Sequence, residues 1–204
     1  MPFNLDAMKI SPLYFLFLLS LVSCARIATD TEYTYNPAIN FRKFQTFDWY
    51  RAEVPKPVAG GAGAQFSLLL DQRIKEAVAS ELVKDGMRPN IENPDLLIAY
   101  DVAVDTKQLE NQGYAFPDGL GYGYSYWYGY RYRYTTNGLE NYRPVQSYAP
   151  GTVVIDIIDP TTNQLLWRGT SSANLDPTAV DELRISTVVA NIMSQFPPTP
   201  DATL

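Results

Sequence analysis

Carboxylates are the side chains of this sequence that come closest to a catalytic pattern. Histidine is absent, which removes the commonest general base and the commonest transition-metal ligand. Asp101 with Asp105 and Asp156 with Asp159 form spaced pairs, and a glycosidase works with two carboxylates alone. The competing interpretation is that these aspartates stand at strand ends, where they are solvated or accept hydrogen bonds from turn backbone. We favour this interpretation, because turn chemistry fully explains Asp159.

The sequence contains no motif for the other kinds of catalytic or ligand site that we considered. There is one cysteine, no lysine in a Ser-x-x-Lys spacing and no Asp-x-Asp-x-Asp-Gly calcium loop. The stretch from Gly60 to Ala64 lacks the Lys-Ser/Thr pair of a phosphate-binding loop and follows a proline-rich linker. The net charge of −6 argues against a nucleic-acid partner, because phosphate binding needs a surplus of lysine and arginine. We therefore expect no enzyme, no metal and no cofactor.

The most conspicuous feature is a run in which every second residue is tyrosine. As one strand, this run would present seven tyrosines on one face, suited to stacking on sugars or bases or to protein contact. As a loop, it would be a low-complexity insertion loosened by glycine. We predict an exposed appendage outside the core, because a buried strand could not easily satisfy seven hydroxyl groups. The candidate binding surface comprises Tyr122, Tyr124, Tyr126, Trp127, Tyr128, Tyr130, Arg131, Tyr132, Arg133 and Tyr134.

The segment Trp167-Arg168-Gly169 lies inside an expected strand and allows two interpretations. Arg168 could face a ligand beside the aromatic platform of Trp167. Alternatively, Trp167 packs in the core while Arg168 faces solvent or pairs with a carboxylate. We favour the second interpretation, because alternate residues of a strand point to opposite faces.

The N-terminal residues predict export and lipid attachment. An apolar run from Ile10 to Val22 is shorter than the roughly 20 residues of a membrane span and has the length of a signal-peptide core. Leu21-Val22-Ser23-Cys24, at its end, resembles the lipobox of bacterial lipoproteins. The resemblance implies a signal peptide over residues 1–23 and acylation of Cys24, which makes the bilayer a partner. Ala25 resembles the outer-membrane default, and we expect the protein to face the periplasm.

Apolar periodicity predicts two amphipathic helices in the mature chain. The first runs roughly from Gln65 to Asp85 and stops at Gly86. The second is capped at Asp176-Pro177-Thr178 and ends at Pro197-Pro198. Alternating patterns predict about five strands, near Tyr33, near Trp49, and over residues 96–104, 152–158 and 165–171. The last two form a hairpin through a turn at Asp159 to Asn163.

These elements predict an α+β fold with one domain over residues 31–198. Its antiparallel or mixed sheet of about five strands would have two helices packed on one face. These two layers would form a closed domain without the tyrosine-rich segment. Residues 24–30 would be the lipidated tether, about 112–150 a Tyr/Gly-rich insertion and 199–204 a C-terminal tail. The residues expected in the core are Ile98, Ile155, Trp167 and Ile192.

Several stretches together resemble a known family. They are the tyrosine-rich first strand, Phe44 to Trp49, Gly86 at the end of the first helix, Pro94 to Ile98, Gly151 to Asp159, Leu166 to Gly169, and Phe196-Pro197-Pro198. With them, nearly all of the mature chain is similar to the bacterial lipoproteins of domain-of-unknown-function family 4136. The resemblance implies a periplasmic or outer-membrane lipoprotein with an α+β domain, and it carries over no catalytic residue.

Two functions stay open at this point. The first is a membrane-anchored envelope lipoprotein with a non-enzymatic binding or structural role toward an envelope protein or glycan. The alternative is a carboxylate-dependent hydrolase that acts on an envelope polymer. We favour the first, because the sequence has neither histidine nor a nucleophile motif. A deep cleft with two carboxylates roughly 5–10 Å apart would support the alternative.

Overall fold

The computed structural model describes residues 30–51, 68–103, 121–125, 130–173, 175 and 181–198. In this part of the chain the strands are β1 (Thr31–Tyr35), β2 (Thr46–Trp49), β3 (Arg88–Pro89), β4 (Leu96–Val102), β5 (Gly121–Ser125), β6 (Tyr130–Tyr134), β7 (Val153–Ile158) and β8 (Leu165–Ser171). The helices are α2 (Leu68–Lys84) and α4 (Glu182–Met193), and the short 3-10 helices are η2 (Phe41–Lys43) and η4 (Val145–Ser147). The predicted α+β fold is confirmed.

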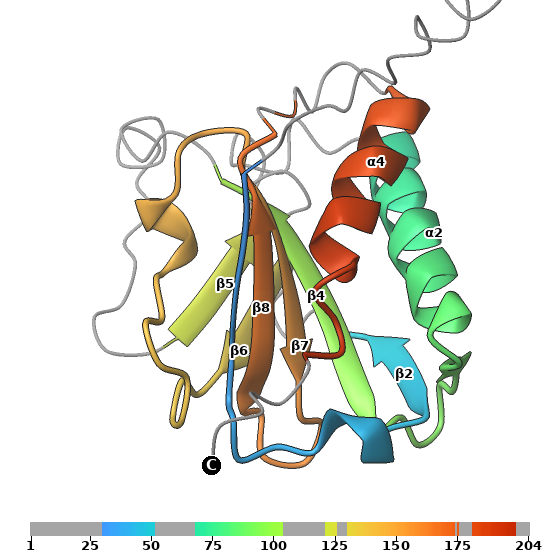
Figure 1. The fold of residues 1–204 in the computed structure, drawn as a ribbon, viewed down its shortest axis with the longest axis vertical. Helices are drawn as coiled ribbons and strands as arrows, with labels where there is room; N and C mark the ends of the chain where they lie inside the picture. Colours follow the sequence, from blue (N-terminus) through green and yellow to red (C-terminus); the bar gives the residue numbers. More distant parts are fainter. Residues whose placement is uncertain are drawn as a thin grey trace, which may run out of the picture.

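A mixed sheet forms the middle layer, and α2 and α4 cover one of its faces (Figure 1). Within the described ranges the sheet has six strands in the order β1-β8-β7-β4-β2-β3. Neighbours from β1 to β4 are antiparallel, whereas β2 is parallel to both β4 and β3. Parallel pairing of β2 with β4 needs a crossover connection, and α2 lies in it. This sheet has one strand more than the five predicted, namely β3, which is two residues long.

The hairpin of β7 and β8 forms as its turn residues predict. Asp159 Oδ1 accepts hydrogen bonds from the backbone N–H groups of Thr161 and Thr162, at 2.7 and 2.9 Å. Asn163 takes the left-handed conformation, with φ of 53°. Because the turn sets the register, Asp156 in β7 stands directly opposite Arg168 in β8.

Both helices bury the faces that were predicted, and the start of α4 differs from its prediction. On α2 the buried stripe is Leu70, Ile74, Val78 and Leu82, and Gly86, with φ of 90°, follows the helix. The start of α4 is a correction, because Asp181 is its N-cap and accepts a hydrogen bond from the backbone N–H of Arg184 at 3.0 Å. Thr178, the predicted cap, lies outside the described residues. α4 ends at Met193, before Pro197.

The core between the sheet and the helices contains every residue predicted for it. Ile98, Ile155, Trp167 and Ile192 are each exposed by no more than 1 %. The ring of Trp167 packs edge-to-face on Phe196, with ring centroids 5.5 Å apart. A Cβ atom at Gly169 would overlap both the Trp167 ring and Ile192. Glycine at this position therefore allows α4 to lie directly on β8.

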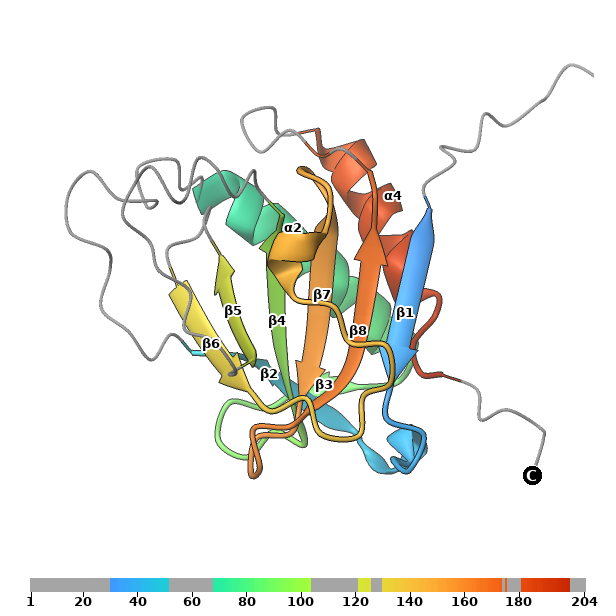
Figure 2. The ribbon, with the colours of Figure 1, turned by 90° about the vertical axis from the view of Figure 1, so that its left-hand side faces the viewer.

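The opposite face of the sheet is also covered, which corrects the prediction of a closed two-layer domain. Every residue of β7 and β8 is buried, whichever face it lies on. Residues 134–149, which we call the cover segment, cross in front of these strands in Figure 2. Tyr134 and Leu139 pack against Ala99, Ile158 and Leu165, and Val145 packs against Ala103 and Val154. Part of the predicted insertion is therefore a third layer of the domain.

Candidate functional site

Buried polar residues lie on the second face of the sheet, under the cover segment. Asp101 in β4 is 1 % exposed, and Asp156 in β7 and Arg168 in β8 are 0 % exposed. Because residues alternate along a strand, they point away from the helices, whereas Trp167 points toward them. The expectation that Asp156 is solvated or bound to turn backbone is therefore wrong. Arg168 does not face solvent but follows the other course predicted for it, pairing with a carboxylate.

Arg168 and Asp156 form a bidentate ion pair, which we call the anchor. Arg168 Nε donates to Asp156 Oδ1 and Arg168 Nη2 donates to Asp156 Oδ2, both at 2.6 Å. Two further hydrogen bonds reach the cover segment. Nη1 donates to the backbone oxygen of Arg143 at 2.6 Å, and Nη2 donates to the hydroxyl of Tyr134 at 2.8 Å. Burial of an ion pair is tolerated when its other donors find partners, and the cover segment supplies these.

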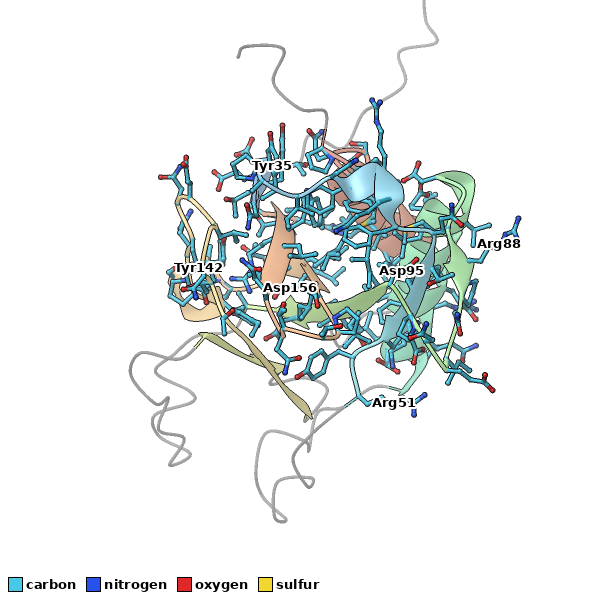
Figure 3. The ribbon with its side chains drawn as sticks, turned by 90° about the horizontal axis from the view of Figure 1, so that it is seen from below. Tyr35, Arg51, Arg88, Asp95, Tyr142 and Asp156 are labelled. Carbon is cyan, nitrogen blue, oxygen red and sulfur yellow. The ribbon has the colours of Figure 1, made fainter. Side chains whose placement is uncertain are left out.

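Two tyrosine rings lie against the guanidinium group of Arg168. Its central carbon is 5.4 Å from the ring centroid of Tyr134 and 5.1 Å from that of Tyr142. The two hydroxyl oxygens are 2.8 Å apart. Burial raises the pKa of Tyr134 well above its usual value, although the charge of Arg168 opposes the shift, so the hydroxyl stays protonated. Figure 3 shows Asp156 in the interior of the molecule and Tyr142 nearer its edge.

The outer rim of the cover segment contacts β1 through weaker interactions. Arg143 Nη1 lies 3.6 Å from Glu32 Oε2, and both side chains are at least half exposed. Arg143 also lies over the ring of Tyr148, 4.5 Å from its centroid. Thr34 Oγ1 donates to the backbone oxygen of Glu140 at 2.5 Å. Exposed ion pairs contribute little to stability, so the anchor is the main side-chain link between the cover segment and the sheet. Backbone hydrogen bonds add to it, because Thr135 donates to Asn163 at 2.8 Å and accepts from Leu165 at 2.9 Å.

The tyrosine run does not form the single strand that would place seven tyrosines on one face. β5 and β6 pair as a separate antiparallel hairpin, beside β4 on the side of the sheet away from the helices (Figure 2). Of the predicted surface, Tyr126, Trp127 and Tyr128 lie between these strands, outside the described residues. The tyrosine alternation is therefore divided between two antiparallel strands and does not continue along one strand.

The register divides the hairpin into two faces of different composition. Tyr122 stands opposite Arg133 and Tyr124 opposite Arg131, and cross-strand partners share a face. We call these four residues the Tyr–Arg face. The other face pairs Tyr130, Tyr132 and Tyr134 with Ser125, Gly123 and Gly121. Tyr134 is 1 % exposed, so the prediction of a wholly exposed run is wrong at this residue, which joins the hairpin to the anchor.

A smaller polar cluster lies on the helix side of the sheet. The hydroxyl of Tyr100, in β4, donates to Asp71 of α2, whose other oxygen lies 3.0 Å from Lys75 Nζ. Lys75 in turn lies over the ring of Trp49, 5.6 Å from its centroid. These contacts satisfy a buried hydroxyl and fix α2 on the sheet, which is a structural role.

The described carboxylates that were singled out for catalysis have structural partners. Asp101 Oδ1 accepts from the backbone N–H of Val102 at 2.7 Å. Asp156 binds Arg168 through both oxygens, and Asp159 binds the turn, as predicted. Asp105, the predicted partner of Asp101, lies outside the described residues. In the ranges that the structure covers, no three or more His, Cys, Asp and Glu residues are grouped as a metal site would need.

Membrane attachment at Cys24 stays a prediction, because residues 1–29 lie outside the described part of the chain. So do residues 199–204. None of the helices in the described ranges has the length and apolar character to cross a membrane.

Tyr142 and Arg143, which enclose the guanidinium group, were not among the predicted site residues. They lie in an irregular part of the predicted insertion, where no periodicity marks one face. The pairing of Asp156 with Arg168 did have a signal, since the predicted hairpin turn sets these residues opposite each other.

A family model described as "Domain of unknown function (DUF4136)" matches residues 31–198. Among solved structures, a DUF4136 family protein from Bacteroides thetaiotaomicron is 16 % identical, with a TM-score of 0.46, and the match covers 82 % of this chain and 95 % of that chain. A PDZ domain protein from Parabacteroides distasonis is 19 % identical, with a TM-score of 0.45; 92 % of this chain covers only 39 % of it.

A PelC dodecamer from Paraburkholderia phytofirmans is 13 % identical, with a TM-score of 0.38, and the match covers 82 % of this chain and 96 % of that chain. No curated protein matches the sequence.

Proposed function

Since the chain belongs to the DUF4136 family, whose function is unknown, we propose a role from its own residues: an outer-membrane lipoprotein, facing the periplasm, whose β5–β6 hairpin binds an envelope protein or glycan without catalysis. The observation that carries this proposal is the construction of the hairpin. It forms a sheet of its own, with the buried Tyr134 on one face and the Tyr–Arg face opposite. Holding a binding surface in place lowers the entropy cost of binding.

The composition of the Tyr–Arg face supports a binding role. Tyrosine rings stack on sugars and pack against protein surfaces, and arginine donates hydrogen bonds to carboxylates and carbonyl oxygens. Residues 121–134 contain two arginines and no acidic residue, although the whole chain has a net charge of −6. The hairpin thus offers a locally positive aromatic surface on an acidic protein.

The alternative of a carboxylate-dependent hydrolase has less support. A general acid or base must reach the substrate, whereas Asp156 is 0 % exposed and both of its oxygens accept from Arg168. Asp159 is committed to the turn. We therefore propose the binding role alone.

Membrane attachment is tested by replacing Cys24. In the wild-type chain we expect labelling by a fatty-acid analogue and recovery in the membrane fraction. The Cys24→Ala variant should lose the label and appear in the soluble fraction, because the sequence has no other cysteine that could be acylated. A variant that stays labelled and membrane-bound would show that the lipobox interpretation is wrong.

The binding surface is tested by photo-crosslinking in cells that produce the acylated protein. A benzophenone side chain at position 122 should yield one discrete adduct, and Arg131→Gln with Arg133→Gln should abolish it. The matched control is the same probe at position 33, because Tyr33 is 46 % exposed on β1, outside the hairpin. No adduct at position 122, or the same adduct at position 33, would contradict the proposed surface.

A further inference from the structure

We propose that the end of the domain at which both helices begin docks onto the lipid bilayer through Leu69 and Leu183. This inference rests on the proposed acylation of Cys24 and adds to it a contact made by the folded domain. Leu69 is 49 % exposed and Leu183 is 75 % exposed, and each is the second residue of its helix. A single exposed leucine needs no explanation, so the proposal depends on where this pair lies.

The start of α4 lies at the end of the sheet where the tether enters. The backbone N–H of Ser172, directly after β8, donates to the backbone oxygen of Asp30 at 3.0 Å. Arg184 Nη2, in the first turn of α4, donates to the backbone oxygen of Ala173 at 2.5 Å. Asp30, where the tether meets β1, is thus bonded to Ser172, and the next residue, Ala173, is bonded to the first turn of α4.

The start of α2 lies at the same end. Arg73 Nη2 is 3.4 Å from Glu182 Oε2, an ion pair that joins the second turn of α2 to the first turn of α4. Figure 1 shows both helices beginning at the upper end of the molecule, and Figure 2 shows β1 beginning there as well. Leu69 and Leu183 thus share the end from which the tether leaves.

The length of the tether sets how far this end can be from the membrane. Asp30 follows Cys24 by six residues, which reach at most about 20–22 Å when fully extended. An acylated Cys24 therefore holds the helix starts close to the bilayer. Such a short connection raises the effective concentration of the leucines at the surface to the order of millimolar. A weak apolar contact is then occupied when its dissociation constant is at or below about 1 mM.

The charges at this end favour an apolar contact over an electrostatic one. The exposed charged residues there are Asp30, Asp181 and Glu182, and acidic side chains do not attract anionic lipids. The two arginines of this end, Arg73 and Arg184, are half-buried and bonded to groups of the protein. The leucines should therefore enter a bilayer made of zwitterionic lipid alone. This expectation separates the proposal from a basic patch that binds anionic headgroups.

The test measures how deeply single positions enter the bilayer in the full-length acylated protein. Leu183→Cys is labelled with an environment-sensitive fluorophore, which reacts at this site alone because acylation blocks Cys24. The matched control is Ile91→Cys, because Ile91 is 68 % exposed in the loop before β4, at the opposite end of the sheet. The proteins are placed on phosphatidylcholine vesicles that carry a nitroxide quencher in the acyl chains.

We expect quenching at position 183 to be several-fold stronger than at position 91, with an unchanged melting temperature for both labelled proteins. Leu69→Cys should behave like Leu183→Cys. Equal quenching at positions 183 and 91 on vesicle-bound protein would overturn the docking while the lipid attachment stands. A wild-type chain that is not acylated and does not bind vesicles would overturn both.

Discussion

Both faces of the sheet are buried, but their chemistry differs. On the helix side, apolar side chains such as Ile155 and Trp167 meet the amphipathic faces of α2 and α4. On the second side, the ion pair of Asp156 and Arg168 occupies the centre, and the cover segment lies over it without helix or strand along most of its length. The comparison teaches that a layer without regular structure can complete a core when it satisfies the charges beneath it.

The largest expected effect compares two neighbours on opposite faces. Trp167→Ala removes a buried aromatic ring and should cost roughly 3–5 kcal/mol in free energy of unfolding. Arg168→Met should cost about the same, roughly 3–5 kcal/mol, because it leaves Asp156 buried without its partner. Urea unfolding of both variants measures these costs. A loss below about 1 kcal/mol for Arg168→Met would show that the second face is open to water.

Replacing both members of the anchor sharpens the comparison. Asp156→Leu combined with Arg168→Met removes both buried charges, so we expect the double variant to lie within about 2 kcal/mol of the wild type. The same urea titration of the two single variants and the double variant gives the coupling free energy. Additive losses in the double variant would mean that the two side chains do not act as a pair.

Tyr134→Phe tests the link between the anchor and the hairpin. The loss of an acceptor for Arg168 Nη2 should cost roughly 1–3 kcal/mol, whereas Tyr142→Phe, the matched control at the half-buried partner, should cost less. The raised pKa of Tyr134 adds a pH dependence. The folded state keeps the hydroxyl proton when the unfolded state loses it, so this contribution to wild-type stability falls above about pH 10. The difference between wild type and Tyr134→Phe should then narrow.

The smallest expected loss of stability is at Asp95, which directly precedes β4 and joins it to the start of β2. Asp95 Oδ2 accepts from the backbone N–H of Gln45 at 2.9 Å and of Thr46 at 3.0 Å, and these bonds, that of Gln45 foremost, lower the pKa of Asp95. Asp95→Asn should cost about 0.5–1 kcal/mol at pH 7, because the carboxylate is solvated. A lowered pKa gives stability that is complete above the unfolded pKa and is lost as the pH falls through the folded pKa, so the cost should start to shrink below about pH 4. A cost that is constant with pH would contradict this assignment.

The helix-side core could be predicted from the sequence because two regular patterns meet there. The alternation in β4, β7 and β8 and the spacing of three and four in the helices each identify one apolar face. Ile98 and Ile192 needed no knowledge of their neighbours. The hairpin turn was equally local, since Asp159 and Asn163 have the conformational preferences that it requires.

The second face could not be predicted in the same way. The rule that a charged strand residue faces solvent holds when that face is open, and nothing local to Arg168 shows that it is covered. Tyr134 carries no mark that separates it from the other six tyrosines of the run, because its burial depends on the long-range contact with Arg168. The change of direction between β5 and β6 could not be predicted either, because the tyrosine alternation continues through it without a break.

Native-state hydrogen exchange at Thr135 tests most directly whether the cover segment belongs to the domain. The backbone N–H of Thr135, one residue after the anchoring Tyr134, donates to the backbone oxygen of Asn163 at 2.8 Å, next to β8. If the cover segment is a layer of the core, this amide should exchange at least about 100-fold more slowly than an unstructured peptide, and Arg168→Met should remove the protection. Exchange at the rate of an unstructured peptide in the wild-type protein would contradict both the third layer and the anchored hairpin.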